Sequence, residues 1–235
     1  MARLSWDGTG EKFFETGTKY GVLYTQNDDG TYADGVEWNG LTGVTENPTG
    51  AEANKLWADN DLYADLRSAE ELEGSITAYT YPDEFAQCDG SGVPEDGIYI
   101  GQQKRRKFGL CYRTEIGNDV SDNLAYKLHI IYGATASPSE KGYTTINDSP
   151  EAVEFSWDFT TTPVKVSKHN DVEYKNTASI VIDSRKFTTT AAKAKLTALE
   201  NILYGVNADS TASPAVTDAA PRLPLPDEVI STLSA

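Results

Sequence analysis

The sequence predicts a mainly β protein, a β-sandwich or barrel with one flanking α-helix and long loops. Several stretches alternate apolar and polar residues, which is the pattern of a strand with one buried face. The chain also contains 13 Tyr and 4 Trp, residue types that pack well on pleated, half-buried surfaces. Apolar residues keep helical spacing over a single long stretch, at about residues 190–204, so one long helix is expected there.

The N-terminal segment is expected to be an arm followed by a hairpin. Residues 8–17 are polar and rich in glycine, which is typical of a loop or arm. Residues 19–25 form a candidate strand, and Asp29 with Gly30 supplies a turn in which a positive φ is tolerated. Residues 31–45 are predicted to be extended chain interrupted by glycines, and they would complete the hairpin.

Residues 46–60 have neither a helical nor a strand period and are therefore predicted to be a long loop. Two large apolar residues, Leu56 and Trp57, lie near its tip. Such a pair on an exposed loop indicates contact with another molecule. The alternative is that both side chains pack back onto the parent domain as a small satellite cluster. The sequence leaves both interpretations open.

The middle of the chain contains the clearest strand patterns. Residues 61–68 and 75–81 alternate apolar and polar residues, with an acidic turn between them. Residues 108–116 and 125–132 are predicted to be core strands joined by a short polar turn, which makes them a hairpin. Residues 134–150 form another long polar loop.

The last strands precede the helix. Residues 153–161 alternate strictly, and residues 178–182 form a short late strand. The helix then has Thr189 or Thr190 as its N-cap and Gly205 just after its last turn. We expect its apolar stripe to lie against the sheet.

The chain is predicted to comprise a β domain over residues 1–205 and an extension over residues 206–235. Residues 207–226 are rich in Ala, Ser, Thr and Pro and are expected to be a linker. Residues 227–234 form a short tail. Because this composition buries little apolar area, the segment from Asn207 onward is expected to lie outside the core.

No motif for catalysis, cofactor binding or metal binding is found in the sequence. It contains no G-x-S-x-G, phosphate-binding loop or H-E-x-x-H motif. Its two histidines, His129 and His169, have no ligand spacing with Cys or a second His, and His129 is predicted to be a structural residue within a strand. We therefore expect no catalytic, cofactor-binding or metal-binding residues and a protein that is not an enzyme.

The charge is strongly negative. The chain has 36 acidic residues against 20 basic ones, a formal net charge of −16. A surface of this kind repels nucleic acid and anionic membranes, although the same charge also serves solubility alone.

Against this acidic background, Lys104, Arg105, Arg106 and Lys107 form a basic run. One interpretation is an electrostatic contact with an acidic surface, such as that of a neighbouring copy. The other is a solvated entrance to the strand that follows.

Two cysteines, Cys88 and Cys111, are expected to be reduced and partly buried, with no disulfide between them. The N-terminus has no apolar signal segment, and no stretch reaches the length of a membrane span. These features predict synthesis and folding in the cytoplasm.

Long segments distributed in order over residues 6–205 carry a resemblance to a known family. They are G-T-G-E-K-F-F-E-T-G-T-K-Y-G-V-L-Y from Gly8, G-V-E-W-N-G-L-T-G-V-T-E-N-P-T-G-A-E from Gly35, I-T-A-Y-T-Y-P-D-E-F-A-Q-C-D-G from Ile76, I-G-Q-Q from Ile100, Y-R-T-E-I-G-N-D from Tyr112, Y-K-L-H-I-I-Y-G from Tyr126, I-N-D-S-P-E-A from Ile146, F-S-W-D-F-T-T-T-P-V from Phe155 and L-E-N-I-L-Y-G from Leu199. The chain resembles the major tail protein family of long, non-contractile-tailed bacteriophages that infect Gram-positive hosts. The segment beyond Gly205 is less typical of that family.

The resemblance implies a tail tube protein of the virion, made in the cytoplasm of the host bacterium. The family's fold is a β-sandwich or barrel with a flanking helix. Its subunits form hexameric rings that stack into the tube through which DNA leaves the capsid. The implied partners are further copies of the chain and the tape measure, distal tail and terminator proteins. Genomic DNA would pass through the lumen without specific binding, and no membrane is involved.

Two other classes of function remain open from the sequence. One is a β-sandwich surface-binding module of a virion or cell, which would stay monomeric and recognise carbohydrate or a host protein through an aromatic patch. The other is a small hydrolase, which would place two carboxyl groups at catalytic separation in a cleft and shift their pKa values.

Overall fold

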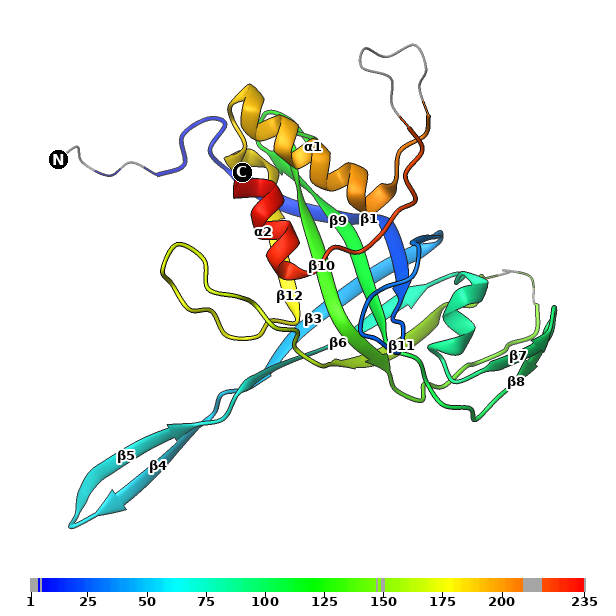
Figure 1. Ribbon diagram of the computed structural model, residues 1–235, viewed down its shortest axis with the longest axis horizontal. Helices are drawn as coiled ribbons and strands as arrows, with labels where there is room; N and C mark the ends of the chain where they lie inside the picture. Colours follow the sequence, from blue (N-terminus) through cyan, green and yellow to red (C-terminus); the bar gives the residue numbers. More distant parts are fainter. Residues whose placement is uncertain (1–3, 5, 147, 149–150, 209–216, 235) are drawn as a thin grey trace.

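The computed structural model describes residues 4, 6–146, 148, 151–208 and 217–234. The predicted class is confirmed, since the chain is mainly β, with a large antiparallel sheet and helices packed beside it (Figure 1). The strands are β1 (Phe13–Thr25), β2 (Val36–Trp38), β3 (Leu41–Gly50), β4 (Ala53–Ala58), β5 (Asp61–Arg67), β6 (Glu70–Ala78), β7 (Gly92–Glu95), β8 (Ile98–Ile100), β9 (Phe108–Asn118), β10 (Ala125–Ala136), β11 (Phe155–Thr161) and β12 (Ser179–Asp183). The described helices are α1 (Thr190–Tyr204), α2 (Pro226–Ser234) and the short 3-10 helices η1 (Asp83–Gln87) and η2 (Ser184–Lys186).

The large sheet folds over into two layers, and strand β10 contributes to both of them. The sheet has the order β2-β1-β9-β10-β11-β6-β3, and β12 pairs with β10 beside this path. Residues 127–131 of β10 pair with β12, whereas residues 134–136 pair with β11. Between them Gly133 has a φ of 59°, and a Cβ there would lie 2.4 Å from the Thr162 carbonyl oxygen. Glycine at this position therefore lets the sheet bend over on itself.

The first core fills the space between the two layers. Trp157 of β11 lies fully buried with its ring centroid 5.1 Å from that of Phe85 of η1, and Trp38 lies 4.6 Å from Phe85. Tilted and edge-to-face pairs of this kind contribute about 0.5–1.5 kcal/mol each beyond burial. Along β9 the side chains alternate, so that Leu110 enters this core and Cys111 enters the second.

The second core lies between the opposite face of the sheet and the helices. Leu196, Leu199 and Leu203 of α1 are buried there, and their spacing is that of one helix face. The Thr189 hydroxyl accepts a 3.1 Å hydrogen bond from the first helical turn, and Gly205 follows the last turn with a φ of 79°. The predicted helix, its cap and its orientation toward the sheet are thus confirmed.

The prediction that the C-terminal segment lies outside the core is wrong for residues 217–234. Residues 209–216, which belong to the predicted linker, lie outside the described residues. Leu223 and Val229 are only 5% and 1% exposed and belong to the second core. The buried Tyr132 hydroxyl donates a 3.0 Å hydrogen bond to the Pro224 carbonyl oxygen. The low average apolar content of the segment was misleading, because a few well-placed apolar residues and carbonyl groups suffice to attach it to the core.

The prediction of a loop over residues 46–60 is also wrong. Strands β3 and β6 pair as far as Gly50 and Glu70, and β4 then pairs with β5. The result is a long hairpin, of which we call residues 47–71 the arm. At its tip Asp59 and Asn60 have φ values of 52° and 65°, the conformation of a tight two-residue hairpin turn.

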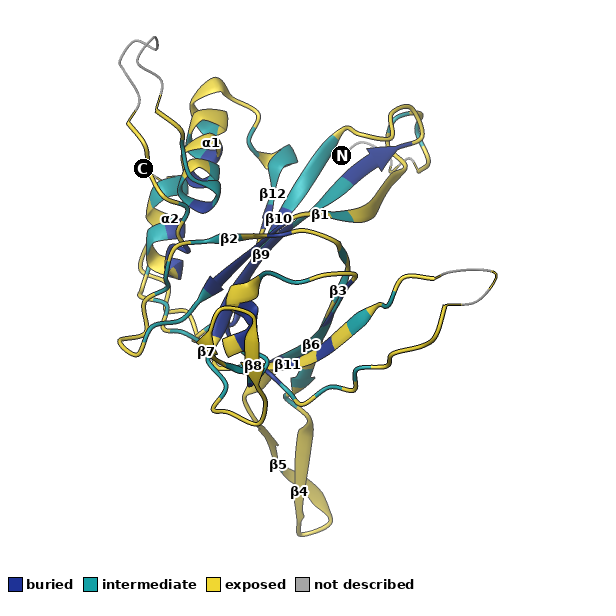
Figure 2. Ribbon diagram, turned by 90° about the vertical axis from the view of Figure 1, so that its right-hand side faces the viewer, coloured by how far each residue is buried: buried dark blue, intermediate teal, exposed yellow. Residues whose placement is uncertain are grey.

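Figure 1 shows the arm leaving the body of the protein, and Figure 2 shows β4 and β5 as exposed strands. None of its residues is buried. A strand with nothing packed on either face has no need for apolar and polar residues to alternate, which explains why residues 46–60 show no strand period. Residues 61–67 do alternate and form the predicted strand, but neither face of it is buried.

Candidate assembly surfaces

The arm presents apolar side chains on both of its faces. Leu56 and Trp57 are consecutive in β4 and therefore point to opposite sides, with exposed fractions of 40% and 67%. Across the hairpin Leu56 is opposite Ala64 and Trp57 is opposite Leu62, because the register shifts between these two pairs and leaves Tyr63 of β5 without a partner. The exposure expected for Leu56 and Trp57 is confirmed, and their contact with another molecule stays a prediction.

Nothing in the described chain covers these side chains. A two-stranded hairpin is marginally stable in water, because it lacks a third strand or helix to bury one face. Full burial of one large apolar side chain contributes about 1.5–3 kcal/mol. The neighbouring Tyr63 and Leu66, at 77% and 54% exposure, extend the same uncovered surface. The arm would therefore be stabilised by a partner that covers it.

Leu62, Tyr63 and Leu66 were not predicted from the sequence to be part of this surface. A signal was present in the sequence. An apolar pair on each side of Asp59-Asn60 has the symmetry of a hairpin around a two-residue turn.

A polar cluster fixes the root of the arm to the main sheet. Glu46 of β3 accepts a hydrogen bond from the Tyr112 hydroxyl of β9. The His129 ring of β10 stacks on Tyr112 with a centroid distance of 4.6 Å, and its Nδ1 atom lies 3.4 Å from Glu46 Oε1. On the other side His129 Nε2 lies 3.6 Å from Glu15 Oε1 and 3.1 Å from Thr114 Oγ1. Strands β1, β3, β9 and β10 thus meet through side chains at this point.

The carboxyl groups of this cluster have lowered pKa values. The contact with His129, helped by the Tyr112 hydroxyl, lowers the pKa of Glu46 in spite of its partial burial. Burial acts to raise the pKa of Glu15, but hydrogen bonds from Lys127 and Thr114 outweigh it and the pKa falls. Both groups are therefore ionised at neutral pH, and they help to hold β1 and β3 against the central strands.

The basic run is largely engaged within the chain. Three of its four side chains join η1 and β9 to neighbouring segments, and Lys104 is left exposed with no hydrogen bond or salt bridge to the described residues. The contacts are Arg105 to the Ser137 carbonyl oxygen and Asp89, Arg106 to the Gln26 carbonyl oxygen and Gln87, and Lys107 to Thr162. A role for the run at an interface stays a prediction, and Lys104 is its most available member.

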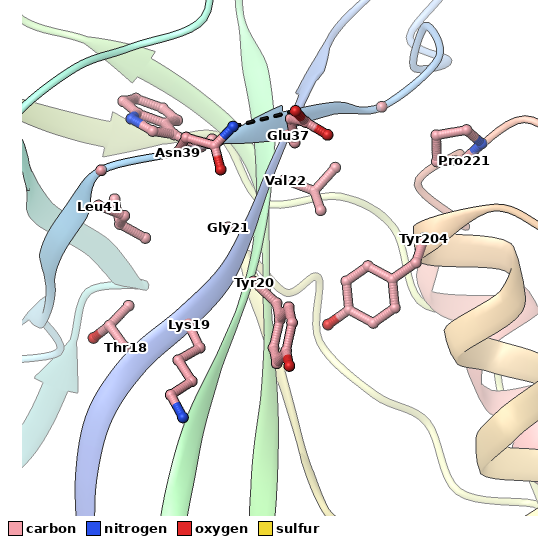
Figure 3. A pocket seen from close by; sticks show the side chains of 13 residues that line it. Thr18, Lys19, Tyr20, Gly21, Val22, Glu37, Asn39, Leu41, Tyr204 and Pro221 are labelled. Atoms are coloured by element: carbon pink, nitrogen blue, oxygen red, sulfur yellow. Dashed lines mark hydrogen bonds between the residues drawn. The ribbon is translucent and has the colours of Figure 1, made fainter.

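A pocket of about 660 Å³ lies between β1, β2 and the end of α1 (Figure 3). Tyr20 lies in its wall at an irregularity of β1, with a φ of 53°, and the Arg113 guanidinium is 5.2 Å from its ring. The described residues that line this pocket include a single carboxylate, Glu37, which accepts a 3.2 Å hydrogen bond from Asn39. The pocket therefore does not offer the pair of carboxyl groups that glycoside hydrolysis uses.

The two thiols lie on opposite sides of the sheet. Cys88 belongs to the first core and Cys111 to the second, and both are buried. Burial raises the pKa of each to about 12. Both thiols are therefore protonated at neutral pH, which makes them poor nucleophiles and poor metal ligands. Within the described ranges, no group of three or more His, Cys, Asp and Glu side chains could hold a metal ion.

Neither the models of known protein families nor the curated proteins contain a match to the chain. In the part of the chain that the structure describes, no helix has the length and apolar character needed to cross a membrane.

Proposed function

We propose that this protein is the structural subunit of a bacteriophage tail tube. Copies of it form hexameric rings, and the rings stack into a conduit for DNA ejection. The observation that carries the proposal is the arm, a long hairpin with both faces uncovered that projects from a compact body. The ordered resemblance over residues 6–205 supports the tube in particular, while the arm supports assembly in general.

The edges of the sheet are consistent with ring formation. Strands β2 and β3 end the sheet order, so each presents an unpaired edge in the described structure. Exposed edges invite pairing with another chain, and closure of a ring pairs them. In this proposal the sheet edges join subunits within a ring, and the arm joins one ring to the next. The tape measure, distal tail and terminator proteins would meet the inside and the two ends of the tube.

The acidic balance of the chain suits a conduit for DNA. A wall of basic residues would bind phosphates with a strong salt dependence. A wall with the sign of DNA keeps the duplex away from specific contacts, so it slides with little friction. The net charge of −16 is consistent with such a wall.

Electron microscopy of the purified chain at rising concentration tests the proposal. We expect rings and tubes of six-fold cross-section for the natural sequence. The double variant Leu56→Ser, Trp57→Ser should fold but should not form tubes, because its arm has lost apolar area on both faces. Substitution of the exposed Val120 by Ser is the matched control and should leave tubes intact. A natural chain that stays monomeric at every concentration would refute the proposal.

A second candidate function is a surface-binding module for carbohydrate. The exposed ring of Tyr20 beside Tyr204 in the pocket of Figure 3 favours it, since aromatic rings at a pocket wall stack on sugars. This candidate requires a monomer whose binding to a glycan array is lost in Tyr20→Ala.

A further inference from the structure

A second pocket, of about 670 Å³, lies where the end of the β9–β10 turn meets η2 and the first turns of α1. Its apolar part is formed by Leu124, which is 49% exposed, with Phe187 and the buried Leu196. Pockets of about 300–1,000 Å³ hold drug-sized ligands. This one is therefore large enough for an indole ring and a neighbouring side chain.

The rim of this pocket is basic in an otherwise acidic chain. Its described lining residues include Arg185 and Lys193 and no carboxylate. Arg185 is paired with Asp183 at 2.6 Å, so its charge is largely compensated. Lys193, and Lys186 which follows Arg185 in the sequence, form no salt bridge with any residue that the structure describes. The pocket is thus suited to an apolar segment that carries negative charge.

The tip of the arm has this chemistry. Trp57 and Leu62 form an exposed apolar pair, and the turn beyond them carries Asp59 and Asp61. Apolar residues would enter the pocket while the two carboxylates meet Lys193 at its rim. Complementary charge of this kind sets the register of a contact and the rate at which it forms.

The tip and the pocket lie at opposite ends of the molecule. In both Figure 1 and Figure 2 the arm leaves the body at one end, and α1 lies toward the other. The tip therefore cannot reach the pocket of its own chain, and only the pocket of a second copy is open to it. A contact between two different surfaces that does not close on itself continues from copy to copy along a filament.

We propose that the arm tip of one copy binds in the pocket between Leu124, Phe187 and Lys193 of the next. The inference rests on the proposed function in so far as this contact joins successive rings. It names the receiving surface, which the resemblance does not supply.

Cysteine cross-linking between differently labelled copies tests the contact directly. One preparation carries Asn60→Cys at the arm tip, and the other carries Thr197→Cys in the pocket. The natural cysteines are buried, so only the introduced thiols are available. After mixing and mild oxidation we expect a heterodimer. Asn60→Cys mixed with Lys175→Cys, which lies in the segment between β11 and β12, is the control and should give none.

Charge reversal supplies a second readout. Asp59→Lys with Asp61→Lys, or Lys193→Glu alone, should raise the protein concentration needed for tube growth about tenfold or more, because like charges then face each other. Combining both changes in one chain should restore growth. Lys175→Glu is the control for a change of net charge.

The outcomes separate this inference from the proposed function. Tubes that grow without the cross-link and without response to the charge reversals would overturn the inference and leave the tail tube standing. A cross-link without tubes would uphold the contact and refute the tube. If neither tubes nor the cross-link form, both proposals fail. A cross-link from the pocket to a cysteine placed at Trp6 would show that the N-terminal segment is the occupant, which also overturns the inference.

Discussion

Glu46 shows how a single side chain can hold a large element in place. It lies where the arm leaves the body, and its partners Tyr112 and His129 come from two central strands. Hydrogen bonds to an ionised group are worth about 1.5–3 kcal/mol, more than those between neutral groups. The attachment of β3 to the central strands is therefore coupled to the ionisation of this carboxyl group.

This coupling gives a pH dependence with a definite sign. The pKa of Glu46 is lower in the folded chain than its ordinary value of about 4.5. Its contribution to stability is therefore present above about pH 4.5 and is lost as the pH falls through the folded pKa. We expect Glu46→Gln to unfold at a lower temperature than the natural chain at pH 7, with the difference narrowing below pH 4.5. The exposed Glu95→Gln serves as the control in the same thermal scans. A difference that persists undiminished at low pH would contradict the assignment.

The elements that were predicted correctly are those with one face against a core. Strands β9, β10 and β11 and helix α1 were located from the sequence, because burial of one face forces their apolar residues into a period. The arm carries no such constraint: β4 was taken for part of a loop, while β5 was predicted as a strand but with one face buried, and that face is exposed. Of the candidate surface, Leu56 and Trp57 were found by size alone, while the receiving pocket arises from residues 124, 187 and 193, which only the fold brings together.

The C-terminal segment illustrates a different limit. Leu223 packs over Gly109 of β9, where a Cβ would lie 2.2 Å from the leucine side chain. This contact joins a glycine in a strand to a leucine more than 100 residues later, and no local sequence pattern predicts it. The segment is consequently part of the folded body in spite of its linker-like composition.

A matched pair of substitutions measures how much this segment stabilises the fold. Leu223→Ala should lower the free energy of unfolding by about 2–5 kcal/mol, the range for removal of a buried leucine side chain. Leu225→Ala, two residues away and 43% exposed, should change it by less than about 0.5 kcal/mol. Chemical denaturation of both variants provides the comparison. Equal and small effects would show that residues 217–234 are only loosely attached.

At the scale of the whole molecule, the distribution of charge matters more than its sum. Three members of the basic run are occupied within the chain, whereas acidic side chains are numerous on exposed positions. If subunits surround DNA, we expect acids to outnumber bases on the surface that faces the lumen. A structure of the assembled tube would decide the matter. A lumen lined mainly by Lys and Arg, with Lys104 among them, would contradict this expectation, and the negative net charge would then serve only solubility.

The bend of β10 at Gly133 has a mechanical consequence. Because β10 is shared by both layers, the arm is connected through β6 and β11 to the helix-covered half of the body by continuous backbone ladders. In Figure 1 the arm continues the direction of β3 and β6. Tension applied at its tip therefore acts on the β6–β11 ladder as shear along the strands, from Glu73 opposite Thr160 to Ala78 opposite Phe155. Hydrogen bonds loaded in shear share the force and must break together, whereas a peeling load breaks them one at a time. A chain of such subunits would transmit a pull along its length before any of them unfolded.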